Sequence, residues 1–284
     1  MTLALVFLLI TLGTALTQSI PDPKSVTLQW LRLGDLIALP LLAVAVVILL
    51  QNPGLHSPPQ ASALFATLML FLGFIIHITF VQLGKRTSQR ITMITLSTLV
   101  AAFFLFGPLF HFTHLAFPAG VAFNTTTDTA YETIARSNVI LIGLSQILSA
   151  FLLGGSIMTM MLGHAYLTAG GKMTQQPFRR LTLTLLIAIP VRALLAVAFG
   201  AIPWCMQYSN HEIESSPSLW TIMLLAGRFA VGFVVPVIMA WMAYQCVRIR
   251  SNQSATGILY VVGLLLLIGE LIAITLWSET GLAF

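Results

Sequence analysis

Polar residues divide the chain into eight long apolar segments, and this pattern predicts the fold. A membrane-spanning helix needs about 20 apolar residues to cross about 30 Å of hydrocarbon, and each segment is close to that length or longer. We therefore expect an all-α integral membrane bundle of about eight transmembrane helices, forming one transmembrane domain over residues 1–284. The expected helices cover residues 1–18, 34–51, 62–84, 91–116, 137–168, 181–204, 218–247 and 255–278.

The composition excludes the classes of protein that fold in water. Hydrophobic residues make up 58% of the chain and charged residues only 7%, whereas a soluble domain carries about 25% charged residues. The chain therefore has too little polar surface for a soluble enzyme, a nucleic-acid-binding protein or a disordered protein. The first partner that the sequence predicts is the lipid bilayer.

The basic residues predict the orientation of the helices. Ten of the thirteen lie in alternate connections, which we place in the cytoplasm by the positive-inside rule, with both termini outside. The first segment lacks the basic beginning and the cleavage site of a signal peptide, so we count it as a span. The expected location is a bacterial cytoplasmic (inner) membrane. The ten residues are Lys24, Arg32, Lys85, Arg86, Arg90, Lys172, Arg179, Arg180, Arg248 and Arg250.

Three ionisable residues lie deep within the expected spans. They are Arg192, Arg228 and Glu270, on three consecutive helices. At about 1.5 Å per residue, all three come within one or two helical turns of the same depth. Such groups are costly in lipid, so they turn inward and pair. We expect an ion-pair cluster with one excess positive charge, which suits a carboxylate, a propionate or a polarised carbonyl oxygen.

Two interpretations of this cluster stay open. In the first, the arginines share Glu270 and nearby carbonyl oxygens and only fasten helices together. In the second, the cluster is a catalytic or binding site in which Glu270 exchanges a proton while Arg192 and Arg228 hold an anion or a carbonyl group.

The histidines suggest a cofactor. His77 and His164 lie toward the cytoplasmic side, whereas His111 and His114 lie near the outer end of the fourth segment. Two histidines from different helices at one depth can ligate a b-type haem, and His77 with His164 is the candidate pair. Hydrogen bonding to a quinone, or a structural role, remains open for each histidine. Apart from haem iron we expect no metal, although an outer site with His211 is the weaker alternative.

Small residues and prolines predict how the helices pack. Gly154 and Gly155 in the fifth segment allow another helix to approach closely. Pro190 and Pro236 lie inside apolar segments, where proline kinks or opens the backbone.

The last two segments carry a family resemblance. The stretch Leu264-Leu-Leu-Leu-Ile-Gly-Glu-Leu271, with Arg228 one helix earlier, resembles the membrane anchor subunits of dimethyl-sulfoxide-reductase-type complexes. That family has eight helices and both termini outside the cytoplasm. Its members bind no haem, oxidise menaquinol and pass electrons to an iron–sulfur partner. The resemblance covers about 50 residues by our count, rests on Glu270 and loosely on Arg228, and does not extend to the first six helices.

Two further segments are similar to uncharacterised bacterial eight-helix membrane proteins, namely Leu162–Leu167 and Gln253–Tyr260. We expect a membrane subunit of a respiratory complex that assembles with other subunits and interacts with quinone, b-type haem or both. The alternatives are a small-molecule, ion or proton transporter, and a structural or assembly subunit.

Overall fold

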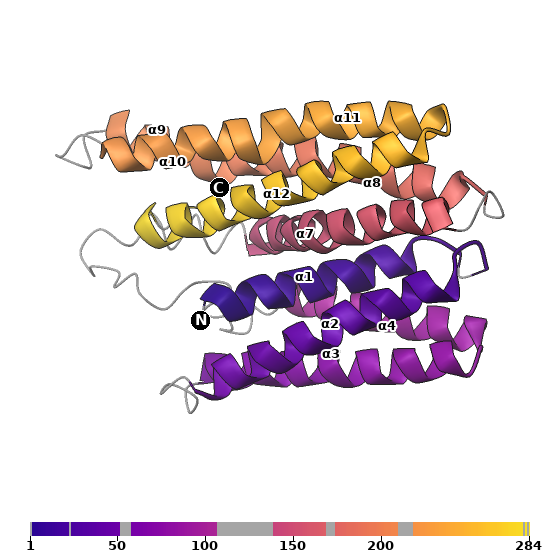
Figure 1. Cartoon of the computed structure of the whole chain (residues 1–284). Helices are drawn as coiled ribbons and strands as arrows, with labels where there is room; N and C mark the ends of the chain where they lie inside the picture. Colours follow the sequence, from indigo (N-terminus) through magenta and orange to yellow (C-terminus); the bar gives the residue numbers. More distant parts are fainter. Residues whose placement is uncertain are drawn as a thin grey trace.

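A computed structural model describes residues 2–22, 24–51, 58–106, 139–168, 174–209, 218–280, 282 and 284. Within these ranges the regular structure is entirely helical (Figure 1). The elements in chain order are α1 (Thr2–Ser19), α2 (Leu28–Leu50), α3 (Pro58–Gln82), α4 (Arg86–Phe106), α7 (Val139–Thr168), α8 (Gln176–Ala196), η2 (Val197–Ala201), α9 (Ile202–Ser209), α10 (Leu219–Phe229), η3 (Ala230–Val234), α11 (Val235–Arg248) and α12 (Asn252–Thr280).

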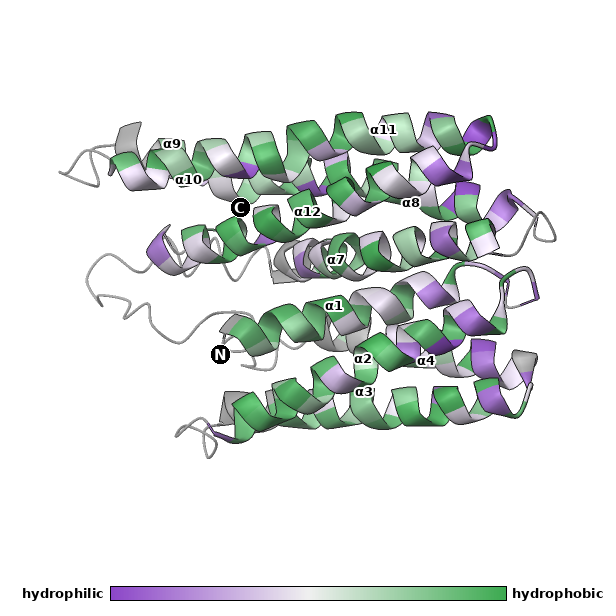
Figure 2. Ribbon diagram, in the orientation of Figure 1, coloured by the Kyte–Doolittle hydropathy of each residue, from purple (hydrophilic) through white to green (hydrophobic). Residues whose placement is uncertain are grey.

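Five helical stretches of the described chain are long and apolar enough to cross a membrane. Figure 2 shows hydrophobic residues along the helices and hydrophilic residues gathered mainly toward the bundle ends. Many large apolar side chains are exposed, such as Leu36 at 65% and Leu264 at 58%. This is the surface expected of a bundle in contact with lipid, which confirms the prediction of a helical membrane protein. The five stretches are Leu28–Leu50, Gly143–Thr168, Gln176–Cys205, Leu219–Arg248 and Asn252–Thr280.

The helices pack as two groups that meet where α1 and α4 pack on α7. In the first group α2 packs on α1 and α3, and α4 packs on α1 and α3. In the second group α8 and α12 pack on α7, and α11 packs on both α8 and α12. The most extensive contact between helices joins α1 to α7, near the middle of the bundle (Figure 1).

Two glycines set the distance between α1 and α7. A Cβ atom built on Gly13 would lie 1.8 Å from the carbonyl oxygen of Ala150, and one on Gly154 would lie 2.3 Å from that of Ile10. Both obstacles are backbone atoms, which cannot turn aside as a side chain can. The predicted role of Gly154 in close helix packing is therefore confirmed.

A methyl group at Gly154 is expected to destabilise the bundle. Gly154→Ala forces α1 away from α7, and overpacking of this kind costs about 1–3 kcal/mol. Gly257→Ala on α12 is the matched control, since a Cβ there meets nothing within 4 Å, and alanine is the better helix former. The thermal unfolding midpoint in detergent should fall for Gly154→Ala and hold or rise for Gly257→Ala. Equal midpoints for the two variants would contradict the close contact.

The second helix begins earlier than the sequence pattern indicates. The expected segment starts at residue 34, but α2 starts at Leu28. The Thr27 side chain caps this helix by accepting a hydrogen bond from the backbone N–H of Trp30 at 3.3 Å, and the Trp30 indole N–H donates to the Met158 carbonyl oxygen at 2.9 Å. The polar residues at this end therefore belong to the helix. Asp35 consequently lies two turns inside α2 rather than at its edge.

Two helices are widened into π-helical turns just before prolines. The segment η2 ends two residues before Pro203, and η3 ends two residues before Pro236. Proline donates no backbone hydrogen bond, and its ring clashes with the carbonyl group four residues earlier. A wider turn at that point relieves the clash and keeps the helix continuous. The predicted opening at Pro236 is thus confirmed, whereas α8 continues as an α-helix through Pro190.

Candidate functional site

The three deep ionisable residues meet inside the second helix group. Arg228 on α10 donates a hydrogen bond to Glu270 on α12, with 2.9 Å between Nη2 and Oε1. Arg192 on α8 lies on the other side of the carboxylate, with 3.9 Å between Nη2 and Oε2. All three side chains are buried. The predicted ion-pair cluster is confirmed, and we refer to Arg192, Arg228 and Glu270 as the triad.

Small residues make room for Arg228 between its helices. A Cβ on Gly269 of α12 would lie 2.5 Å from the Cα of Gly232 in η3, so the two backbones are close together here. A Cβ on either glycine would also come within 3.2 Å of Arg228 Nη1. The guanidinium carbon lies 4.2 Å from the centre of the Phe233 ring, in cation–π geometry. The glycines and the ring together fix the guanidinium against Glu270.

Both arginines also converge on one backbone oxygen. The backbone oxygen of Phe284 accepts hydrogen bonds from Nη2 of Arg192 at 2.7 Å and from Nη2 of Arg228 at 3.4 Å. Arg192 is further held by Ser149 on α7, to whose Oγ its Nε donates at 2.8 Å. The two arginines of the triad therefore hold an oxygen atom beside the Glu270 carboxylate. This oxygen comes from Phe284, a residue that the sequence pattern does not place near the triad.

The triad has more donors than partners. Arg192 Nη1 and Arg228 Nε are buried and make no hydrogen bond with the described residues. A buried donor without a partner costs about 1–3 kcal/mol, and a charged one costs more. Two guanidinium groups thus face one carboxylate side chain and one backbone oxygen, with further buried donors left over. The geometry is compatible with both interpretations of the triad, a binding site or a structural fastening of helices.

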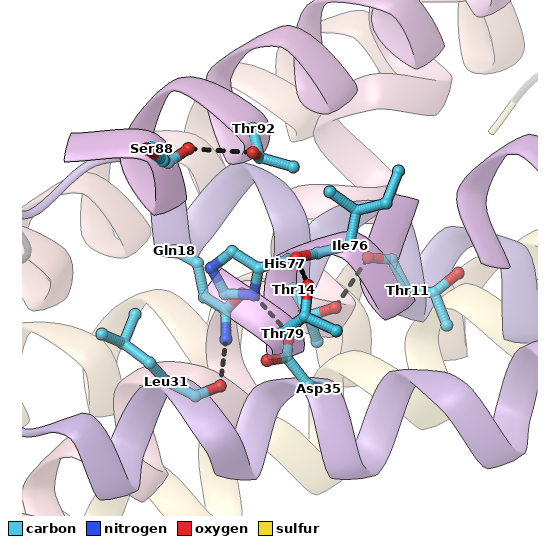
Figure 3. Close-up of polar contacts among 10 residues, drawn as sticks. All are labelled: Thr11, Thr14, Gln18, Leu31, Asp35, Ile76, His77, Thr79, Ser88 and Thr92. Carbon is cyan, nitrogen blue, oxygen red and sulfur yellow. Dashed lines mark hydrogen bonds and ion pairs between the residues drawn. The ribbon is translucent and has the colours of Figure 1, made fainter. Parts of the chain in front are cut away.

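A second buried polar cluster lies in the first helix group. Nδ1 of His77 on α3 and Oδ1 of Asp35 on α2 are hydrogen-bonded at 2.7 Å, and both side chains are fully buried (Figure 3). Sequence reasoning identified His77 but missed Asp35, because the expected helix began at residue 34. Two features of the sequence could have indicated Asp35. It is a lone carboxylate at the start of an apolar run, and Thr27, eight residues earlier, is a residue type that caps helices.

The atoms around this pair are incompletely hydrogen-bonded. The side chain of Gln18 on α1 lies beside the pair (Figure 3) and donates from Nε2 to the Leu31 carbonyl oxygen at 3.0 Å. Gln18 Oε1, Asp35 Oδ2 and His77 Nε2 are buried and make no hydrogen bond with the part of the chain that the structure describes. Buried polar atoms of this kind are ordinarily satisfied by internal water or by a ligand.

The candidate haem ligands are not brought together as a pair. His77 is fully buried against α2, whereas His164 on α7 is exposed. His111 and His114 lie outside the described residues, as does His211. A histidine that donates from Nδ1 to a carboxylate and keeps Nε2 free has the arrangement of a metal ligand. A b-type haem needs a second axial ligand that faces the same space, and His77 is the only histidine that the structure shows as buried in the described ranges.

No metal centre is apparent in the described ranges. Within them, no group of three or more His, Cys, Asp or Glu side chains is placed to hold a metal ion. The two cysteines, Cys205 and Cys246, are free thiols. The chemistry of the described chain is therefore concentrated in the triad and in the Asp35–His77 pair.

Comparisons with known proteins add no relative. No protein-family model, no curated protein and no solved structure matches the chain. The functional argument therefore depends on the geometry of the chain itself.

Proposed function

We propose that the chain is the membrane subunit of an electron-transfer complex and that it binds a quinone at the triad. The observation that carries this proposal is the convergence of both guanidinium groups on one backbone oxygen beside Glu270. A quinone also presents oxygen atoms that accept hydrogen bonds. Guanidinium donors strengthen as negative charge develops on that oxygen during electron transfer. The resemblance of the last two helices to quinol-oxidising anchor subunits points in the same direction.

We infer roles for the three residues in quinol chemistry. Oxidation of a quinol releases two electrons and two protons. We assign the electrons to a redox centre in a partner subunit and one proton to the Glu270 carboxylate, with the other released to water. Arg192 and Arg228 hold the quinone oxygen. The Arg192–Glu270 contact is the longer of the two at 3.9 Å, so it is the one that a bound quinone most readily replaces.

We also propose that all eight helical stretches span a bacterial cytoplasmic membrane, with both termini outside. In support of this orientation, the C-terminal ends of α1, α3, α7 and α11 lie at one end of the bundle (Figure 1). Most of the basic residues of the sequence come at or after these helix ends or in the first turn or two of the helix that follows. The positive-inside rule assigns that end to the cytoplasm.

Quinone binding by the purified chain tests the proposal without a partner subunit. Menadione should quench tryptophan fluorescence saturably in the wild type, and Arg192→Gln should weaken its affinity tenfold or more. That factor corresponds to the loss of about 1.4 kcal/mol, as for one hydrogen bond to a charged group. The matched control is Arg179→Gln, because Arg179 is an exposed arginine on the same helix. Equal affinities for wild type and Arg192→Gln would exclude the triad as the quinone site.

Transport is the second candidate function, and one observation favours it. The helices that carry Arg192 and Arg228 both contain a π-helical segment within two turns of the arginine, and transporters place their sites at interrupted helices. Proteoliposomes distinguish the two functions. Substrate-dependent uptake of an organic anion that is abolished by Arg228→Gln would favour transport over electron transfer.

A further inference from the structure

A groove runs along the surface between α2 and α3, which lie side by side (Figure 1). Its volume is about 440 Å³, within the range of about 300–1,000 Å³ in which proteins bind small molecules. Both helices contribute to its walls, and none of its residues belongs to the triad. The lining residues are Gln29, Arg32, Leu33, Leu36, Ile78 and Gln82.

The helical spacing directs this groove away from the core. On α2 the other lining residues come three, four and seven positions after Gln29, so all of them lie on one side of the helix. The residues from α3 are four positions apart and share a face in the same way. Leu36 is 65% exposed, whereas Asp35 and His77 are fully buried. The groove therefore lies on the surface that meets lipid.

The groove changes from polar to apolar along its length. Gln29 and Arg32 lie toward the start of α2 and Gln82 at the end of α3. Leu36 lies further along α2, and Ile78 lies one turn before Gln82 on α3, so both are farther from this end of the bundle. From Gln29 to Leu36 the rise along α2 is about 10 Å. The headgroup layer on each side of a bilayer is about 5–8 Å thick, so this rise is enough to pass from the headgroups into the hydrocarbon.

The polar side chains of the groove have no partner in the described chain. Arg32, Gln29 and Gln82 make no hydrogen bond or ion pair with any residue that the structure places. Further basic residues lie at the same end of the bundle, among them Lys24 and Lys85, which are exposed. The guanidinium of Arg32 and the amides of Gln29 and Gln82 thus line the polar end of the groove, where the basic residues nearby favour an anion.

We propose that this groove binds one anionic phospholipid. Arg32 pairs with the phosphate, Gln29 and Gln82 donate hydrogen bonds to the phosphate or glycerol oxygens, and an acyl chain lies along Leu36 and Ile78. The charge on Arg32 gives the preference for an anionic head, and the apolar floor requires a lipid rather than a free headgroup. This site is independent of quinone binding at the triad.

Lipid titration followed by native mass spectrometry tests the proposal on the purified chain. Phosphatidylglycerol should bind at one site about fivefold more tightly than phosphatidylcholine with the same acyl chains, the factor expected for one basic residue near the headgroup layer. Arg32→Gln should abolish this preference. Arg180→Gln is the matched control, because it removes an exposed arginine of the same end from a different helix, and it should leave the preference intact. Ile78→Trp fills the apolar part of the groove and should weaken the binding of both lipids.

Three results would overturn the proposal. The first is equal binding of the two lipids by the wild type. The second is an equal loss of preference in Arg180→Gln and Arg32→Gln, which would mean that the basic end attracts anions without a defined site. The third is displacement of phosphatidylglycerol by glycerol 3-phosphate at similar concentration, which would show that the lipid chain contributes nothing. Arg32 is exposed, so misfolding is not expected, and circular dichroism checks that the variants stay folded.

Discussion

Replacing Arg228 with methionine should lower the free energy of unfolding by about 3–5 kcal/mol, the usual cost of removing one partner from a buried ion pair. The change leaves the Glu270 carboxylate, only 4% exposed, with Arg192 at 3.9 Å as its nearest cation. It also removes the cation–π contact with Phe233 and one of the two donors to the Phe284 oxygen. The thermal midpoint and the denaturation curve in mild detergent measure the effect.

A double variant separates the loss of a pair from the loss of packing. Arg228→Met combined with Glu270→Met removes both charges, and well-packed apolar replacements of buried pairs are often close to neutral. The double variant should therefore be more stable than Arg228→Met alone. Arg179→Met, which removes an exposed cation beside Tyr244, should change stability little. If the double variant is less stable than either single variant, the ion pair is not what makes Arg228 important.

Stability alone does not distinguish a binding site from a structural fastening of the helices. Loss of Arg228 destabilises the bundle under either interpretation. Ligand affinity, measured on the folded fraction of each variant, is the quantity that differs. A variant such as Arg192→Gln that folds normally and still fails to bind quinone would support the functional interpretation.

The triad could be predicted from the sequence because membrane helices fix depth. A constant rise of about 1.5 Å per residue converts sequence position into depth once the spans are known, and charged groups in lipid must find one another. Depth does not give the direction of a side chain around its helix, however. His77 and His164 were paired by depth, yet one is buried and the other exposed.

The contacts that sequence reasoning missed depend on helix ends and on distant segments. Asp35 was missed because the Thr27 cap starts α2 before the apolar run begins. The hydrogen bond from Arg192 to the Phe284 oxygen joins residues 92 positions apart, and no local pattern specifies it. The π-helical turn before Pro203 follows from proline chemistry, but proline alone does not choose between a kink and a wider turn, as Pro190 shows.

The Asp35–His77 pair should show strong energetic coupling. Asp35→Leu leaves a buried imidazole, and His77→Leu leaves a buried carboxyl group, so each variant should lose about 3 kcal/mol or more of unfolding free energy. The double variant should lose less than the sum of the two, with a coupling energy of about 1–3 kcal/mol. A double-mutant cycle by denaturation in detergent measures this coupling directly.

The control cycle combines Asp35→Leu with Thr256→Val on α12, in the other helix group, where the two losses should add to within about 0.5 kcal/mol. Additivity in the Asp35–His77 cycle as well would contradict an interaction between the two side chains.

Strong coupling, by contrast, would mean that the first helix group keeps a costly polar pair that apolar residues can replace. Retaining such a pair inside an apolar bundle is typical of functional positions. The doubly apolar variant, folded but without the pair, should therefore lose any function of the chain that uses Asp35 and His77.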